Sequence, residues 1–348
     1  MKRFYTIIIV LVLAVIGYFA AGILMRHSLE VTASTQHPTL SRGSCIDCHA
    51  PIAEEWRKSF HYKSLTGPFW ARINNKGFAT LFETLRVPCK NCHAPANILD
   101  LPQGSSPALR VDDLKLGVDC VSCHVSEQGI TGPGRNAAAP HEVRTDERFV
   151  EPELASTGLC AHCHEEQEGQ GRVVTAWKRS TFAAEGVTCV DCHMPETNAP
   201  ITTSGSPRLR RSHRFPGDKD PEMLSKALNA SVEVTEDKRV VVQIINDRVG
   251  HDFPAAGTNS LIVKVTLEDE SGQVLDVEEH SFGTIESIPG YLDFWPFHQI
   301  SRIPPGEHRE IVAQLPARHG KVIVQFKYRD WFAITDKDVV IATLTRKY

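Results

Sequence analysis

The spacing of apolar and polar residues changes twice along this chain of 348 residues and predicts three regions. Residues 1–30 hold one continuous apolar run. Residues 31–217 contain short stretches of helical spacing, separated by Pro and Gly. In residues 218–348, short stretches alternate apolar and polar residues one by one, which is the pattern of half-buried strands. We therefore expect one membrane helix, a mainly α domain with few strands, and a C-terminal all-β domain.

The apolar run covers Phe4–Met25 without a charged residue, and a helix of about 20 residues can cross a bilayer. Lys2 and Arg3 precede the run, which favours a cytoplasmic N-terminus and places the rest of the chain on the other side. A small residue at Ala33 leaves a cleaved signal peptide as the alternative. We expect an uncleaved transmembrane helix, anchored in the inner membrane, with the other regions facing the periplasm or the cell exterior.

The alternating stretches of the C-terminal region are rich in valine and isoleucine and are separated by turn signals such as Glu270-Ser271-Gly272. Several short strands of this kind predict an immunoglobulin-like sandwich. In the middle region the clearest helices are Glu54–Lys63 and Thr175–Glu185. The predicted strands cover residues 231–235, 239–245, 261–267, 309–315, 321–328 and 338–344.

All ten cysteines lie in the middle region, where they form five copies of Cys-x-x-Cys-His. This spacing is the attachment signature of a c-type haem, whose iron the histidine binds. Zinc sites and disulfides also use paired cysteines, but neither needs a histidine after every pair. We therefore expect five covalently bound haem c groups. Their ligands are Cys45, Cys48 and His49; Cys89, Cys92 and His93; Cys120, Cys123 and His124; Cys160, Cys163 and His164; and Cys189, Cys192 and His193.

The sixth ligand of each iron determines what the iron can do. A histidine closes the iron as an electron carrier, a methionine raises its potential, and an open position admits a substrate. The chain has only four methionines, of which Met1 and Met25 belong to the N-terminal segment, so histidine is the expected ligand. The predicted sixth ligands are His61, His141, His213 and His251.

The alternative reading of these four residues is an ordinary histidine. His61 could lie on a helix surface, and His251 lies in a turn between two predicted strands, where it could simply be hydrogen-bonded. If His251 is a ligand, the β-domain contributes to the haem core.

The formal net charge is −4, and the basic residues are dispersed, so we expect no nucleic-acid partner. One local cluster of arginines follows the last motif. We expect it to be a solvated loop, with pairing to haem propionates as the alternative. The cluster comprises Arg208, Arg210, Arg211 and Arg214.

Several of these segments resemble the cytochrome c-552/c-554 group of multihaem proteins, which is related to hydroxylamine oxidoreductase. The resemblance rests on Trp56-x-x-Ser59-x-His61 after the first motif, on Trp177-x-x-Ser180 before the fifth, and on Ser212-His213-x-Phe215-x-Gly217. It implies that His61 and His213 are sixth ligands and that the haems stack in pairs. Phe182 departs from the pattern, because it stands where a second histidine would follow Trp177-x-x-Ser180.

These features favour an electron carrier over an enzyme. The expected partners are a cytochrome or a quinol-linked membrane donor and a terminal reductase or extracellular acceptor. One alternative is an oxidoreductase that acts on a small nitrogen or sulfur compound at a five-coordinate haem, since four sixth ligands are predicted for five irons. The other alternative is a subunit of a larger haem complex or filament.

Overall fold

The computed structural model describes residues 44–67, 90–135, 141–165, 173–218, 220–255, 259–284, 300–316, 319–330 and 338–348. All of them belong to one compact unit, His37–Tyr348. None of the helices within these ranges is long and apolar enough to span a membrane. The membrane helix predicted at Phe4–Met25 lies outside the described residues, as does Cys89 of the second motif.

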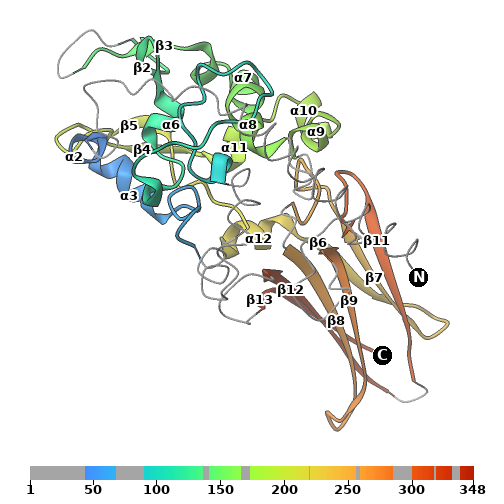
Figure 1. The fold of residues 1–348 in the computed structure, drawn as a ribbon. Helices are drawn as coiled ribbons and strands as arrows, with labels where there is room; N and C mark the ends of the chain where they lie inside the picture. Colours follow the sequence, from blue (N-terminus) through green and yellow to red (C-terminus); the bar gives the residue numbers. More distant parts are fainter. Residues whose placement is uncertain are drawn as a thin grey trace, which may run out of the picture. The chain divides into compact units, whose positions relative to one another are not determined.

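Four of the Cys-x-x-Cys-His motifs are described in full, and each forms a short helical turn (Figure 1). Side chains form capping hydrogen bonds at the start of two of these turns. Asp119 accepts from the Ser122 N–H at 3.0 Å, while the Thr188 backbone N–H and hydroxyl both donate to Asp191 at 2.8 Å. The turns are α2 (Cys45–Cys48), α6 (Cys120–His124), α8 (Ala161–His164), which continues the π-helical η3 (Ser156–Cys160), and α11 (Cys189–His193).

Short elements connect these turns. The helices are α3 (Ala50–Lys58), η1 (Leu114–Leu116), η2 (Glu147–Phe149), α7 (Pro152–Ala155), α9 (Val173–Lys178) and α10 (Thr181–Ala184). The strands are β1 (Val125–Ser126), β2 (Gly129–Gly132) and β3 (Arg144–Thr145) in one small sheet, and β4 (Glu196–Ala199) and β5 (Arg208–Arg211) in an antiparallel hairpin.

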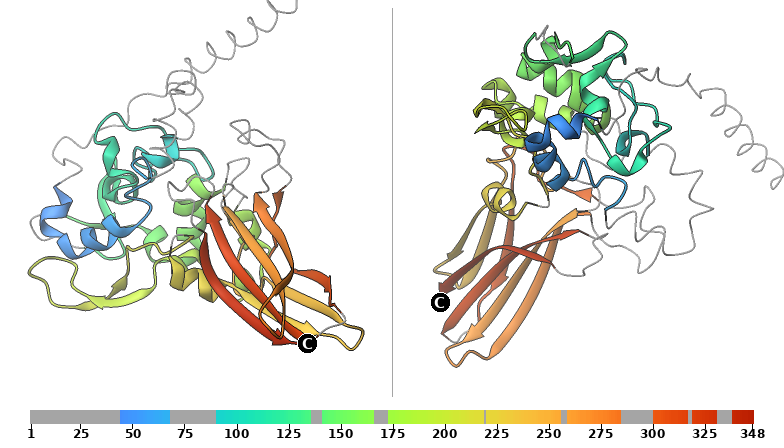
Figure 2. Two further views of the ribbon diagram at one scale, coloured as in Figure 1. Left: turned by 90° about the horizontal axis from the view of Figure 1, so that it is seen from below. Right: turned by 90° about the vertical axis from the view of Figure 1, so that its left-hand side faces the viewer.

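The C-terminal region begins with helix α12 (Pro221–Ala227) and continues as two antiparallel sheets that lie face to face (Figures 1 and 2). The larger sheet has the order β10-β9-β8-β12-β13, and the smaller has the order β11-β7-β6. Their strands are β6 (Asn229–Val234), β7 (Arg239–Ile245), β8 (Asn259–Asp269), β9 (Val274–Thr284), β10 (Ile300–Ser301), β11 (His308–Gln314), β12 (Gly320–Asp330) and β13 (Val339–Lys347).

One buried apolar cluster fills the space between the two sheets. It includes Val242 from the smaller sheet and Val265 and Phe326 from the larger one. Along β7 the buried positions alternate with partly exposed ones, because successive side chains of a strand point to opposite faces. The all-β C-terminal region predicted from this alternation is therefore confirmed.

Two sequence expectations differ from the structure. The helix predicted at Glu54–Lys63 ends at Lys58, and the one predicted at Thr175–Glu185 is divided into α9 and α10, because Ser59 and Ser180 have extended backbone conformations. In both places the serine hydroxyl donates to the carbonyl of the tryptophan three residues before it, at 2.6 Å. Strand β9 and helix α12 were not predicted at all.

Candidate haem-binding site

Each described motif histidine lies with its ring anchored or buried by the chain. Four of them have Nδ1 within hydrogen-bonding distance of a backbone carbonyl: His49 at 3.1 Å from Ile201, His93 at 2.8 Å from Ser64, His124 at 3.0 Å from Thr131, and His193 at 2.6 Å from Pro216. A carbonyl oxygen only accepts hydrogen bonds, so Nδ1 carries the hydrogen in each case. The Nε2 lone pair is then available to a metal, and the carbonyl fixes the ring orientation.

The structure places all four predicted sixth ligands opposite a motif histidine. Every pair joins one histidine of a Cys-x-x-Cys-His motif to one histidine from outside the motifs. The pairs, with their ring-centroid distances, are His49 with His141 (6.0 Å), His61 with His164 (6.3 Å), His124 with His213 (6.2 Å) and His193 with His251 (6.2 Å).

These distances fit a metal between two imidazoles. A metal–imidazole bond is about 2.0 Å long, so two such bonds separate the two nitrogens by about 4 Å and the ring centres by about 6 Å. Ordinary aromatic pairs also occur at such distances. These four pairs are distinguished by two shared features. Each joins a motif histidine to a histidine outside the motifs, and their ring-centroid distances are nearly equal. The donor set therefore fits four irons with two histidines each.

Burial keeps four of these imidazoles, those of His61, His164, His213 and His251, in the neutral form that a metal ligand needs. Burial, together with the neighbouring His164, lowers the pKa of His61 to about 3. Burial also lowers the pKa of His164, His213 and His251 to about 4 in each case. At neutral pH each of these rings has a lone pair to offer.

His141 differs from His213 and His251 in its second nitrogen. The Nδ1 atoms of His213 and His251 each contact a backbone carbonyl, of Arg211 at 3.2 Å and of Asp252 at 2.9 Å. The Nδ1 of His141 is buried and has no hydrogen-bond partner among the described residues. The ring of His141 itself lies 6.0 Å from the ring of His49 in the first motif.

The two tryptophan–serine segments have the same local structure but continue to different residues. Trp56 and Trp177 each donate their indole N–H to a carbonyl, of Val118 at 2.7 Å and of Val187 at 2.9 Å. The first segment continues to His61, which faces His164. The second continues to Phe182, which cannot bind iron.

The turn of the sandwich that carries His251 packs at this second segment. A Cβ atom on Gly250 would lie 3.3 Å from Trp177 and 3.4 Å from Phe182, so the turn packs closely against both side chains. His251 itself faces His193. The departure at Phe182 is therefore accompanied by a histidine from the all-β region.

Thiols of different motifs also contact each other. Cys45 lies beside Cys120, Cys160 beside Cys189, and Cys92 beside Cys163. The attachment points of the first and third motifs, of the second and fourth, and of the fourth and fifth are therefore neighbours. For the second motif the structure gives His93, whose Nδ1 lies 2.8 Å from the Ser64 carbonyl oxygen. We assign no sixth ligand to His93.

The arginine cluster after the last motif is only partly the solvated loop that we expected. Arg208 is exposed, but the side chain of Arg210 is only 6% exposed and pairs with Glu55 at 2.8 Å. Arg211 pairs with Asp191 at 2.9 Å. The sequence offered no signal for the role of Glu55, because it lies 155 positions from its partner.

The anchored motif turns and the paired histidines define a multihaem c-type cytochrome. Residues 44–125 match the family model described as "Cytochrome c554 and c-prime". A penta-heme cytochrome c552 from Thermochromatium tepidum has a similar fold, with a TM-score of 0.59, 19% identity, and coverage of 89% of this chain and 99% of that chain. The resemblance to the c-552/c-554 multihaem cytochromes is therefore confirmed.

Other comparisons add little. A superoxide reductase from Nanoarchaeum equitans covers 38% of this chain and 97% of its own length at 13% identity, with a TM-score of 0.21 that supports no inference. No curated protein matches the sequence.

Proposed function

We propose that this protein is an electron carrier with five covalently attached haems, of which at least four have two histidine ligands. The observation that carries the proposal is the set of four histidine pairs at ring-centroid distances of 6.0 to 6.3 Å. When bound, haem supplies reversible one-electron chemistry at its iron.

The chain's own residues hold the groups and close them to solutes. Cysteine pairs on short helical turns attach them covalently, and backbone carbonyls fix the ring orientations of His49, His124 and His193. The outer histidine of each pair fills the position that a substrate would need, which favours electron transfer over catalysis. The contacts between thiols of different motifs support close spacing of the groups, as an electron carrier requires.

The location and partners belong to the same proposal. The apolar segment Phe4–Met25 would anchor the protein in the inner membrane, with the haem-bearing part facing the periplasm or cell exterior. The donor would be a cytochrome or a quinol-linked membrane protein, and the acceptor a terminal reductase or an extracellular acceptor.

Haem content and ligand response test the function. The denatured protein should carry the mass of five haems, and its visible spectrum should change reversibly during a redox titration. Addition of nitrite or cyanide should leave the spectra of the four paired haems unchanged. A chain without covalent haem, or one whose paired haems bind these anions, would refute the proposal.

A further inference from the structure

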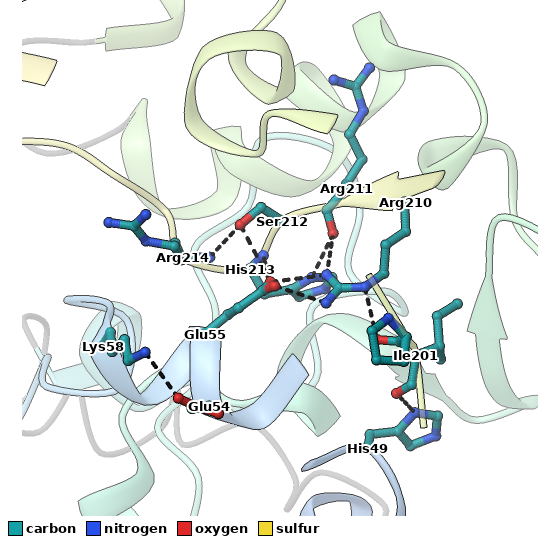
Figure 3. A network of polar contacts seen from close by, with 11 residues as sticks. His49, Glu54, Glu55, Lys58, Ile201, Arg210, Arg211, Ser212, His213 and Arg214 are labelled. Carbon is teal, nitrogen blue, oxygen red and sulfur yellow. Dashed lines mark hydrogen bonds and ion pairs between the residues drawn. The ribbon is translucent and has the colours of Figure 1, made fainter. Parts of the chain in front are cut away.

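A buried ion pair joins the first motif region to the β4–β5 hairpin. Arg210 on β5 donates from Nη1 and Nη2 to the two carboxylate oxygens of Glu55 on α3, at 2.9 and 2.8 Å (Figure 3). The side chains are only 6% and 20% exposed. Such a two-bond contact fixes the relative orientation of both groups, which a single-point ammonium would not do.

The same guanidinium reaches two backbone carbonyls that bear on different haem ligands. Its Nη1 donates to the carbonyl of Arg211 at 3.1 Å, and that carbonyl also accepts from Nδ1 of His213 at 3.2 Å. Its Nε donates to the carbonyl of Pro200 at 3.2 Å. The next carbonyl in the chain, of Ile201, accepts from Nδ1 of His49 at 3.1 Å.

Glu55 fixes the backbone of the same outer histidine. One carboxylate oxygen accepts from the backbone N–H of His213 at 2.8 Å and from the Ser212 hydroxyl at 3.3 Å (Figure 3). The same carboxylate therefore holds both the guanidinium of Arg210 and the backbone of His213.

We propose that Glu55 and Arg210 are positioning residues that set the imidazole orientations of His49 and His213, and so tune two haems together. The two histidines belong to different pairs, since His49 faces His141 and His213 faces His124. The inference rests on the proposed function, because it requires both pairs to bind iron. Hydrogen bonds to the outer nitrogen of a metal-bound imidazole set the ring orientation and the strength of the ligand.

The chain provides a matched control one residue away. Glu54 also forms an ion pair, with Lys58 at 3.1 Å, but both side chains are largely exposed, at 70% and 65%. Glu54→Gln removes the same charge from the same helix without touching a histidine. Arg210→Lys is the milder second variant, because it keeps the charge but loses the planar set of donors.

The experiment compares electron paramagnetic resonance spectra and redox titrations of the oxidised full-length variants, after haem content has been measured. We expect Glu55→Gln and Arg210→Lys to keep five haems per chain, to shift the g-values of two low-spin haems, and to shift the potentials of the same two. Glu54→Gln should leave all signals at their wild-type positions. A merely structural role would alter haem content or all signals together.

Three results would overturn the proposal: unchanged spectra in both variants, a uniform shift of every haem, or the same shift in Glu54→Gln. If Glu55→Gln does not accumulate, Arg210→Lys decides alone, and unchanged signals in that variant refute the positioning role. A wild-type protein without haem would refute the proposed function instead. Haem-loaded wild type whose spectra match those of both variants would refute only the positioning role.

Discussion

The two halves of the described chain are stabilised by different means. In the C-terminal region, nineteen buried apolar residues form one continuous cluster, whereas the largest separate cluster among the described residues of the motif region contains only three, Ala161, Val174 and Trp177. The motif region instead buries polar side chains such as Arg110, Asp119 and His162, and it largely encloses the Arg210–Glu55 pair. A haem is a large apolar plate, so covalent haem replaces the missing core in one half and is not needed in the other.

The largest expected effect is the loss of stability of the motif region when haem attachment is prevented. Full-length protein made without haem attachment should lose protection from hydrogen exchange throughout residues 90–135, because little apolar surface remains to hold these elements together. The strands β7, β8 and β12 should keep their protection, since their shared cluster does not involve a cofactor. Hydrogen-exchange mass spectrometry measures both regions in one sample. Equal protection of the motif region with and without haem would show that haem does not stabilise this region.

The next effect concerns the apolar core of the sandwich. Phe326 is fully buried, so Phe326→Ala should reduce the free energy of unfolding of this region by about 3–5 kcal/mol. Val340→Ala is the control on the neighbouring strand: its side chain is 51% exposed, and the change should be within about 0.5 kcal/mol. Denaturant unfolding followed by far-ultraviolet circular dichroism compares the two variants. Equal losses would show that the buried cluster does not stabilise the sandwich.

A third prediction concerns His251, the residue of the all-β region that faces His193 of the motif region. His251→Ala should convert one low-spin haem, that of His193, into a high-spin haem that binds cyanide, because the outer ligand is lost. His280→Ala serves as the control, since its ring lies on β9 beside Glu278 at 3.2 Å. Electron paramagnetic resonance distinguishes the two spin states. A low-spin signal of full intensity in His251→Ala would remove the sandwich from the haem core.

The smallest effect is electrostatic and confined to the sandwich. Arg329 Nε donates a hydrogen bond to Asp338 Oδ1 at 2.7 Å, and this bond holds the pKa of Asp338 below its usual value. Because the folded-state pKa is the lower one, the pair stabilises the fold above the unfolded-state pKa, and the gain is lost as pH falls through the folded-state value. Asp338→Asn should therefore cost up to about 1 kcal/mol at neutral pH and nothing in strong acid. Denaturant unfolding of both proteins at the two pH values measures the difference in the free energy of unfolding. A difference that persists in strong acid would contradict the prediction.

Local patterns carried more of the fold and of the candidate site than long-range contacts did. The Cys-x-x-Cys-His spacing predicts the motif turns. The scarcity of methionine favours histidine as the sixth ligand, and the predicted ligands are His61, His141, His213 and His251. Strict alternation of apolar and polar residues predicts β7. It does not predict β9, because the exposed Val274 and Val277 interrupt the alternation.

Contacts between distant segments could not be read from the sequence. Each outer histidine had an ordinary surface or turn alternative, and only the folded chain shows which motif histidine it faces. Glu55 lies beside Glu54 on the same helix, yet one is buried against Arg210 and the other is solvated. Nothing in the composition of the arginine cluster separates Arg210 from its exposed neighbour Arg208.

Near-infrared magnetic circular dichroism of the oxidised full-length protein tests the histidine pairs most directly, because it identifies the axial ligands of low-spin haems. We predict a signal of two histidine ligands whose intensity accounts for at least four haems per chain. An intensity that accounts for fewer than four, or a methionine-ligand signal in its place, would contradict the assignment of the four pairs.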